Sequence, residues 1–223
     1  MITYKINDLI SLICLYQSKM MTMNLLSDLI LFLHDKKSIR LGDFVLSSGK
    51  NSKFYIDLRI LQSHPKYFRM SIQLFKEYII YNIGLDNFDF ICSIPTSGTI
   101  FGSSLAYALF KPHIYIRKNA KTYGTQKSIE GDFIPYSKVL FIDDVMTTGN
   151  SLISSMDHLK DQSIINDCLV FVDRQQSPSK LLKYSKINFH KIISINEIFE
   201  VLYKNKRINY ENYKELKNEL EKF

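Results

Sequence analysis

Short apolar runs alternate along this chain with segments whose apolar residues recur at helical spacing. Each short run predicts a buried strand, and the runs cover residues 88–94, 113–116, 139–142 and 165–172. Helical spacing predicts helices over residues 23–34, 65–81, 99–110, 151–159 and 179–184, and in the charged tail from Ile195. Strands that alternate with helices predict an α/β fold with a mostly parallel, doubly wound sheet flanked by helices.

A small N-terminal hood precedes this core. Residues 44–46 and 54–58 predict two strands around a Ser-Ser-Gly-Lys-Asn turn. The pattern divides the chain into an N-terminal extension (1–22), a helix and hood segment (23–60), an α/β core (61–200) and a C-terminal helical segment (201–223). The extension lacks a basic start and a small-residue cleavage site, which argues against a signal peptide. It is either an extra helix or a stretch upstream of the true start.

The composition is that of a globular domain. The chain has 223 residues, of which 46% are hydrophobic and 23% charged, enough to bury a core. No apolar run reaches the ~18 residues that span a membrane, so we expect no membrane association. The cysteines Cys14, Cys92 and Cys168 are far apart in the chain. They predict buried free thiols, without metal spacing, in a reducing, cytoplasmic compartment.

The net charge of +7 suits a polyanionic small substrate as well as a nucleic acid. The lysines are spread along the chain, and neither a helix-turn-helix nor a zinc signature is present. We therefore expect a small-molecule substrate and no nucleic-acid partner.

The most informative stretch, residues 138–151, reads Lys-Val-Leu-Phe-Ile-Asp-Asp-Val-Met-Thr-Thr-Gly-Asn-Ser. The predicted strand delivers Asp143 and Asp144 at its carboxyl end, where open α/β sheets bind ligands. The following loop places backbone N–H groups at a helix start, which suits a phosphate. A turn and a helix cap would explain an isolated Asp-Asp pair, but not the whole run. Acceptors for hydroxyls beside donors for phosphate indicate a sugar phosphate.

This run resembles the signature of type I phosphoribosyltransferases, which use phosphoribosyl pyrophosphate (PRPP). The resemblance implies that Asp143 and Asp144 hold the ribose hydroxyls and have a catalytic role. It implies that the loop wraps the 5′-phosphate through Thr147, Thr148, Gly149, Asn150 and Ser151. It also implies a Mg²⁺ cofactor held mainly by PRPP and water rather than directly by the protein, since magnesium prefers substrate phosphates to an all-protein cage.

Residues 117–136 form a long polar stretch, and such loops inside compact domains are usually functional or disordered. The part up to Gly131 resembles the catalytic loop of orotate phosphoribosyltransferases. The resemblance implies that Arg117, Lys118, Lys121 and Tyr123 bind PRPP, with Lys121 as the mobile catalytic cation that neutralises the leaving diphosphate. In that family the loop reaches the neighbouring subunit, which implies a homodimer with shared active sites. On charge alone, a solvated basic loop is the alternative.

The loop at 94–99 precedes a predicted helix, so the N–H groups of Ser97 and Gly98 are candidates to hold pyrophosphate. A plain strand-to-helix turn is the alternative. Some members of the family carry Lys at the position of Ser97, so contact there would be made through the backbone or the hydroxyl.

Two segments resemble the base-binding parts of orotate phosphoribosyltransferases. Residues 44–59 resemble the hood that covers the pyrimidine, which implies that Tyr55 lies near the base. Many members carry Lys where this chain has Ser47, and Arg59 or Lys50 are candidates to compensate. Arg174, at the end of a predicted strand, is implied to bind the orotate carboxylate, because a planar guanidinium suits a carboxylate. A plain hairpin and a local Asp-Arg ion pair are the respective alternatives.

Together these resemblances imply transfer of phosphoribose from PRPP to orotate, giving orotidine 5′-monophosphate and pyrophosphate in pyrimidine biosynthesis. Thr147 is implied to contact orotate as well as PRPP. Two alternatives stay open. One is a phosphoribosyltransferase for a purine or another base. The other is a PRPP-sensing regulator that binds nucleic acid and has lost catalysis.

Overall fold

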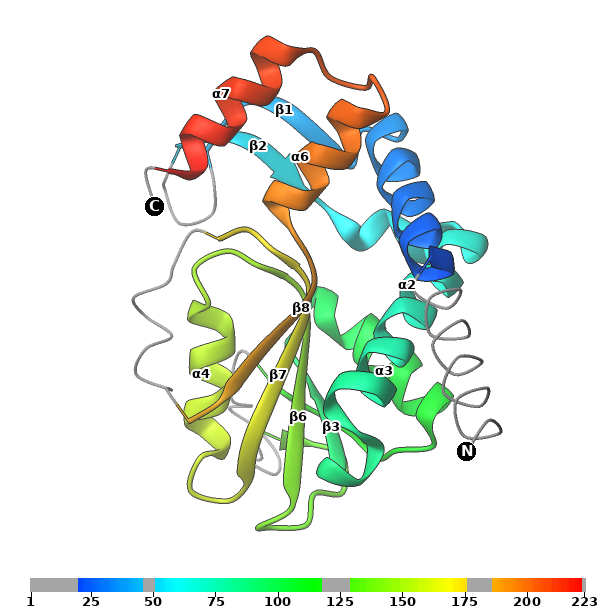
Figure 1. Cartoon of the computed structure of the whole chain (residues 1–223). Helices are drawn as coiled ribbons and strands as arrows, with labels where there is room; N and C mark the ends of the chain where they lie inside the picture. The colour runs from blue at the N-terminus through cyan, green and yellow to red at the C-terminus, as the bar shows by residue number, and fades with distance from the viewer. Residues whose placement is uncertain (1–19, 46–50, 118–128, 176–185, 222–223) are drawn as a thin grey trace, which may run out of the picture.

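A six-stranded sheet forms the centre of the computed structural model, which describes residues 20–45, 51–117, 129–175 and 186–221 (Figure 1). The strands are β3 (Phe90–Ser93), β4 (His113–Ile116), β5 (Ile129–Glu130), β6 (Lys138–Met146), β7 (Ile164–Asp173) and β8 (Asn188–Ser194). Their order is β5-β4-β3-β6-β7-β8, and all neighbours are parallel except β4 and β5. The mostly parallel α/β sheet predicted from the sequence is confirmed.

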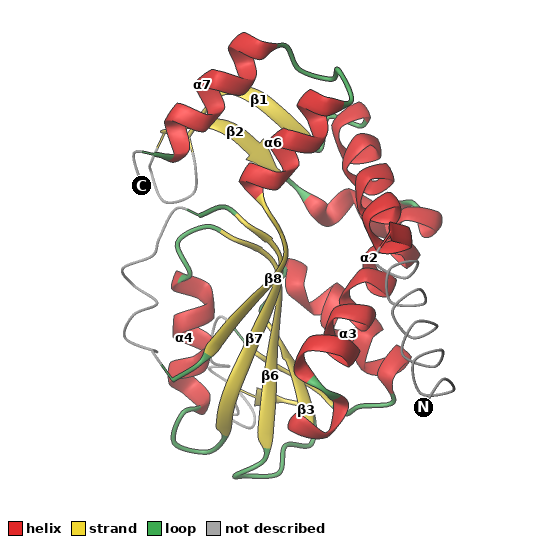
Figure 2. Cartoon of the chain, viewed as in Figure 1, coloured by secondary structure: helices red, strands yellow, loops and turns green. Residues whose placement is uncertain are grey.

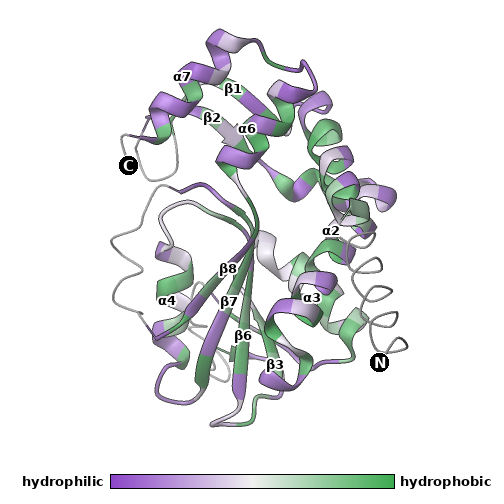
Figure 3. Cartoon of the chain, viewed as in Figure 1, coloured by the Kyte–Doolittle hydropathy of each residue, from purple (hydrophilic) through white to green (hydrophobic). Residues whose placement is uncertain are grey.

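Helices cover both faces of the sheet (Figure 2). Helices α2 (Pro65–Tyr78) and α3 (Ser97–Leu109) lie on one face, and α4 (Asn150–Leu159) lies on the other. Successive side chains of a strand point to opposite faces, so β6 supplies both interfaces. Leu140 packs in the cluster that contains α2 and α3, whereas Phe141 packs with α4. Figure 3 shows the hydrophobic residues concentrated along the middle strands.

The hood lies beyond the carboxyl ends of the sheet strands (Figure 1). It contains a helix over residues 20–35 and the antiparallel pair β1 (Ile39–Val45) and β2 (Asn51–Ile56). The C-terminal helices α6 (Ile195–Lys204) and α7 (Tyr210–Leu220) complete this layer. Buried Phe199 of α6 packs edge-on against Phe54 of β2, with ring centroids 5.3 Å apart. The N-terminal hood strands and the C-terminal helices therefore share one core.

Several element boundaries differ from the sequence-based predictions. Strand β6 continues past Ile142 to Met146, because this stretch keeps pairing with β7. Helix α2 ends at Tyr78 and passes into a π-helical turn over Ile79–Ile83. Residue Leu58, predicted in a strand, begins a 3₁₀ helix, η1 (Leu58–Ser63). A second 3₁₀ turn, η3 (Leu85–Asn87), precedes β3.

Strand β8 was not predicted. It lies at the edge of the sheet and pairs with β7 among the described strands. Its residues are mostly half-buried and include Asn188, His190 and Lys191, so it lacks the continuous apolar run that marks a central strand. The helix predicted at 179–184 and the predicted strand end at Leu46 lie outside the described residues.

The predicted burial of Cys92 and Cys168 is confirmed, and both are free thiols. Burial raises the pKa of each thiol, which makes them unreactive. Within the described ranges, no helix is both long and apolar enough to cross a bilayer.

Candidate active site

The sheet reverses its direction of growth between β3 and β6. After β3 the chain passes through α3 to β4 on one side, and after β6 it passes through α4 to β7 on the other. Ser93 and Ile142 are paired, so the loops that follow these two strands begin side by side. Open α/β sheets bind ligands at such a switch point. Both loops carry residues that the sequence predicts to bind PRPP.

The paired acids lie within the last residues of β6, near its carboxyl end, rather than after a strand that ends at Ile142. Asp143 is only 9% exposed, and its Oδ1 accepts a hydrogen bond from the backbone N–H of Asp144 at 2.9 Å. Burial raises the pKa of Asp144, while hydrogen bonds, including one from the Ser97 hydroxyl, oppose that rise. Carboxylates held in this way are acceptors for ribose hydroxyls.

Gly98 allows the start of α3 to lie directly against β6. A Cβ on Gly98 would lie 2.8 Å from Asp143 Oδ1 and 3.1 Å from the carbonyl oxygen of Ile142. Only a residue without a side chain fits this approach. The structure therefore brings Ser97, Gly98 and both acids into one cluster at the switch point.

The loop predicted to bind the 5′-phosphate leads into α4. Gly149 is the N-cap residue in the left-handed conformation, with φ 70°, and no side chain caps the helix. The N-terminal N–H groups of such a helix suit an anion. Thr147 and Thr148 are half-buried in the same loop.

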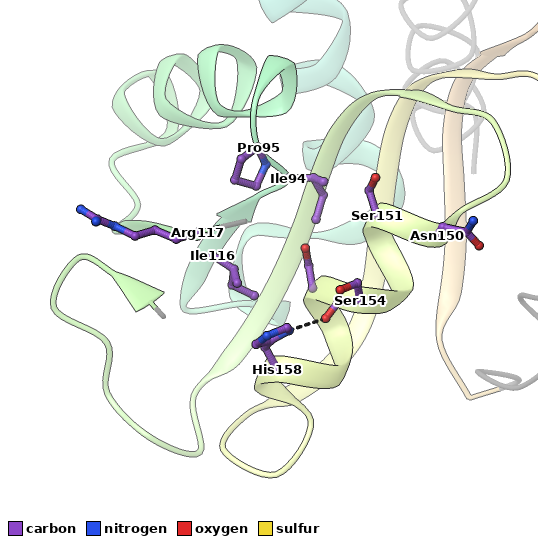
Figure 4. Close-up of a pocket in the computed structure, with 9 residues that line it drawn as sticks. Ile94, Pro95, Ile116, Arg117, Asn150, Ser151, Ser154 and His158 are labelled. Carbon is purple, nitrogen blue, oxygen red and sulfur yellow. Dashed lines mark hydrogen bonds between the residues drawn. The ribbon is translucent and has the colours of Figure 1, made fainter. Parts of the chain in front are cut away.

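A pocket of about 380 Å³ opens beside this helix start. Figure 4 shows that α4 lines one side through Asn150 and Ser151, and that Pro95 and Arg117 lie on the other. Arg117 forms an ion pair with Glu130 through its Nε. This pocket joins the phosphate loop, the β3–α3 loop and the first cation of the predicted catalytic loop. The other predicted residues of that loop, Lys118, Lys121 and Tyr123, lie outside the described residues.

Arg174 links the sheet to the hood. It is 3% exposed, and its Nη2 donates hydrogen bonds to Ser52 Oγ at 3.0 Å and to the carbonyl oxygen of Phe54 at 3.2 Å. Its Cζ lies 4.4 Å from the centre of the Phe54 ring. Burial lowers the pKa of Arg174 to about 10. Its Nε is buried and has no hydrogen-bond partner among the described residues.

The local ion pair considered for Arg174 is wrong. Asp173 instead lies 3.9 Å from Lys191 Nζ and accepts a hydrogen bond from the backbone N–H of Gln175 at 2.8 Å. The Arg174 side chain therefore turns toward β2 rather than toward its neighbour in sequence.

Tyr55 of β2 belongs to a cluster of aromatic and cationic side chains. Arg40, its partner on β1, places its Cζ 4.7 Å from the Tyr55 ring centre. The Tyr55 hydroxyl accepts a hydrogen bond from Arg59 Nη2 at 3.3 Å. Ser47 and Lys50 of the same hairpin lie outside the described residues. Sequence reasoning missed the Asp57–Arg59 pair beside Tyr55, whose only local signal was the Asp-Leu-Arg order.

Comparisons with known proteins identify the family of this chain. Residues 59–204 match the family model described as phosphoribosyl transferase domain. This span covers both loops of the switch point and ends with α6. Fold and site therefore define a phosphoribosyltransferase.

Similar proteins of known identity narrow the kind of phosphoribosyltransferase. The chain is 38% identical over 173 residues to the orotate phosphoribosyltransferase of Cenarchaeum symbiosum, covering 77% of this chain and 86% of that protein. The crystal structure of orotate phosphoribosyltransferase from Aeropyrum pernix is 30% identical, with a TM-score of 0.67 over 81% of this chain and 99% of the other. UMP synthase from Leishmania donovani gives a TM-score of 0.76 at 25% identity, but this chain spans only 42% of that one. The chain belongs to the orotate phosphoribosyltransferase family.

Proposed function

We propose that this chain transfers the 5-phosphoribosyl group from PRPP to orotate, giving orotidine 5′-monophosphate and pyrophosphate for pyrimidine biosynthesis. The observation that carries the proposal is the cluster at the switch point, where Asp143 and Asp144 meet the Ser97–Gly98 loop. The buried Arg174, with its unpartnered Nε, adds a cation for an acidic base. Acceptors for ribose, donors for phosphates and a guanidinium for a carboxylate match the two substrates.

In the proposed reaction, a ring nitrogen of orotate attacks the anomeric carbon of PRPP. The bond from that carbon to the diphosphate oxygen breaks, and pyrophosphate leaves with the electron pair while the proton of the ring nitrogen passes to water. Positive charge develops on the ribose, as in glycoside chemistry. Asp143 and Asp144 orient the ribose by accepting hydrogen bonds from its hydroxyls. The start of α4, from Thr147 to Ser151, holds the 5′-phosphate.

The remaining catalytic groups act on the leaving diphosphate. We assign Arg117 and the N–H groups of Ser97 and Gly98 to its binding, together with Lys118, Lys121 and Tyr123 of the catalytic loop. Catalysis then comes mostly from positioning and from stabilising charge that develops on the leaving group.

Mg²⁺ fits this site, because the acids at the end of β6 supply oxygen donors beside the expected diphosphate. When bound, it would neutralise diphosphate charge. Among the described residues, no group of three or more His, Cys, Asp or Glu could hold a metal ion. We propose that PRPP and water provide most of its ligands.

We also propose a cytoplasmic homodimer in which the catalytic loop of each subunit serves the active site of the other. Buried free thiols support a reducing compartment. Mixing a Lys121→Ala subunit with an Asp144→Asn subunit tests the shared site. Each variant alone should be nearly inactive, and mixed dimers should regain activity at one of their two sites. Mixtures that stay inactive despite subunit exchange would contradict the arrangement.

The base specificity is tested by supplying Mg-PRPP with orotate, uracil, adenine, guanine or hypoxanthine, and measuring pyrophosphate release. Orotate alone should be consumed at a substantial rate. Turnover of a purine in its place would assign the chain to another base. Inactivity with every base, combined with nucleic-acid binding that weakens steeply with salt, would identify a regulator instead.

A further inference from the structure

Arg59 lies in the first turn of η1, shortly after β2, and hydrogen bonds hold its side chain in one orientation. Asp57 Oδ1 accepts hydrogen bonds from the Arg59 backbone N–H at 3.0 Å and from its Nε at 2.7 Å, and Oδ2 accepts from Nη2 at 2.6 Å. Asp57 is anchored in turn, because its N–H donates to the carbonyl oxygen of Ser38 at 3.0 Å and its own carbonyl accepts from the Ser38 hydroxyl. A guanidinium fixed on two sides loses little entropy when it binds a ligand.

Arg59 lies between the base side and the ribose side of the proposed site. Its Nη2 reaches the Tyr55 hydroxyl on the base side. Asp57 raises the pKa of Arg59 most, and the charge of Asp144, on the ribose side, adds to this rise. Burial lowers the pKa of Arg174, and Tyr55 partly offsets this effect. Arg59 and Arg174 therefore lie near Tyr55, as does Arg40 of β1.

The negative charge of the acceptor base would be stabilised better by two cationic side chains than by one. Orotate carries a carboxylate, and its ring gains negative charge as the attacking nitrogen loses its proton. Arg174 has already committed its Nη2 to Ser52 and Phe54 of the hood. Arg59 keeps 56% of its side chain exposed, so a ligand can reach it.

We propose that Arg59 is a substrate-binding residue of the acceptor site, which contacts the anionic pyrimidine together with Arg174, and that Asp57 is its positioning residue. The inference deepens the proposed function and rests on it. Arg59 supplies charge to the base, whereas the paired acids and the α4 loop bind PRPP. Loss of Arg59 should therefore weaken the binding of orotate more than the binding of PRPP.

Steady-state kinetics of Arg59→Gln, Asp57→Asn and a control variant test this assignment. The control is Arg207→Gln, because Arg207 forms a comparable exposed pair with Asp35 at 3.1 Å, outside the proposed site. Removing a charged hydrogen bond typically weakens binding about 10–100-fold, so Arg59→Gln should raise the KM for orotate by that factor. The KM for PRPP should change by less than about threefold, within the ordinary scatter of such effects. Asp57→Asn should shift orotate in the same direction but less, and Arg207→Gln should match the wild type.

An unchanged KM for orotate in Arg59→Gln would overturn the proposal, as would equal rises for both substrates. If Arg59→Gln does not fold, Arg59→Lys decides, since it keeps the charge but loses the planar fork. Its KM for orotate should still rise selectively, and an unchanged value would overturn the proposal. The wild-type base assay is separate. A wild-type enzyme that is inactive on orotate refutes the proposed function itself. A wild-type enzyme that is active on orotate, combined with an unchanged KM for orotate in Arg59→Gln, refutes only this inference.

Discussion

Replacing Gly98 with alanine tests whether the close approach of α3 to β6 shapes the PRPP site. In a helix, the change from glycine to alanine alone would stabilise by about 0.5–1 kcal/mol. Here the new Cβ would lie 2.8 Å from Asp143 Oδ1, 3.1 Å from the Ile142 carbonyl oxygen and 3.2 Å from Asp143 Cα. Two of these three atoms belong to the backbone, so a side-chain rotation cannot relieve every contact.

The size of the effect follows from the displacement. Widening the contact with Asp143 Oδ1 from 2.8 to an ordinary 3.4 Å requires a movement of about 0.6 Å. That movement also strains the hydrogen bond from the Asp144 N–H to Asp143. Overpacking of this kind costs about 1–3 kcal/mol, which exceeds the propensity gain. A 1 Å misplacement of catalytic groups costs ~10²-fold in rate, so we expect kcat/KM for PRPP to fall about tenfold.

The matched control is Gly102→Ala, one turn further along α3. Its Cβ would lie 2.5 Å from Ser93 Cβ and 3.2 Å from His113 Nε2, so it also clashes, but without touching the acids. Thermal unfolding should show a lower Tm for both variants. Titration calorimetry and kinetics should show a PRPP defect larger in Gly98→Ala than in Gly102→Ala at matched stability. A Gly98→Ala protein with raised Tm and wild-type PRPP kinetics would refute the reasoning.

Three further predictions follow from the site and from the hood. Because burial raises the pKa of Asp144, the stability that this group contributes falls as pH rises above its ordinary value of 3.8. Asp144→Asn should therefore raise Tm at neutral pH, measured by calorimetry, while losing about 10–100-fold in PRPP affinity, and a lowered Tm would contradict this. Lys121→Ala should cut kcat about 10²–10³-fold in single-turnover assays with little change in PRPP binding, and unchanged turnover would exclude the loop from catalysis. Phe199→Ala should cost about 3–5 kcal/mol in denaturant unfolding, because Phe199 is fully buried against Phe54, and a loss below 1 kcal/mol would show that α6 does not hold the hood.

The parts of the site that sequence reasoning located are those built within one short segment. The run from Lys138 to Ser151 carries its own apolar strand, its acids and its helix start, so local pattern alone fixed their relative places. The mostly parallel sheet also followed, because strands that alternate with helices along the chain favour parallel pairing. Strand β8 was not predicted, because its half-buried edge positions are mixed in polarity.

The contacts that join distant segments could not be predicted in this way. Ser52 and Arg174 are separated by 122 positions, and their hydrogen bond depends on how the hood docks on the sheet. The same holds for Phe54 and Phe199, which lie in segments that the sequence pattern assigned to separate parts. Side-chain chemistry indicated what Arg174 could bind, but not that it would also support the hood.

Arg174 supports the hood and is also the residue that we propose to bind the acceptor. The Arg174 guanidinium is positioned by the hydrogen bonds that its Nη2 donates to Ser52 and Phe54. If Arg174 binds the acceptor as proposed, hood docking and acceptor binding depend on one buried side chain, because shifting β2 would remove the partners that orient it. Phe54 strengthens this coupling, since its carbonyl binds Arg174, its ring lies 4.4 Å from the Arg174 Cζ and the same ring packs on Phe199. Changes in the α6 packing should therefore reach the proposed acceptor site through Phe54 and Arg174, without altering the acids that we propose to hold the ribose.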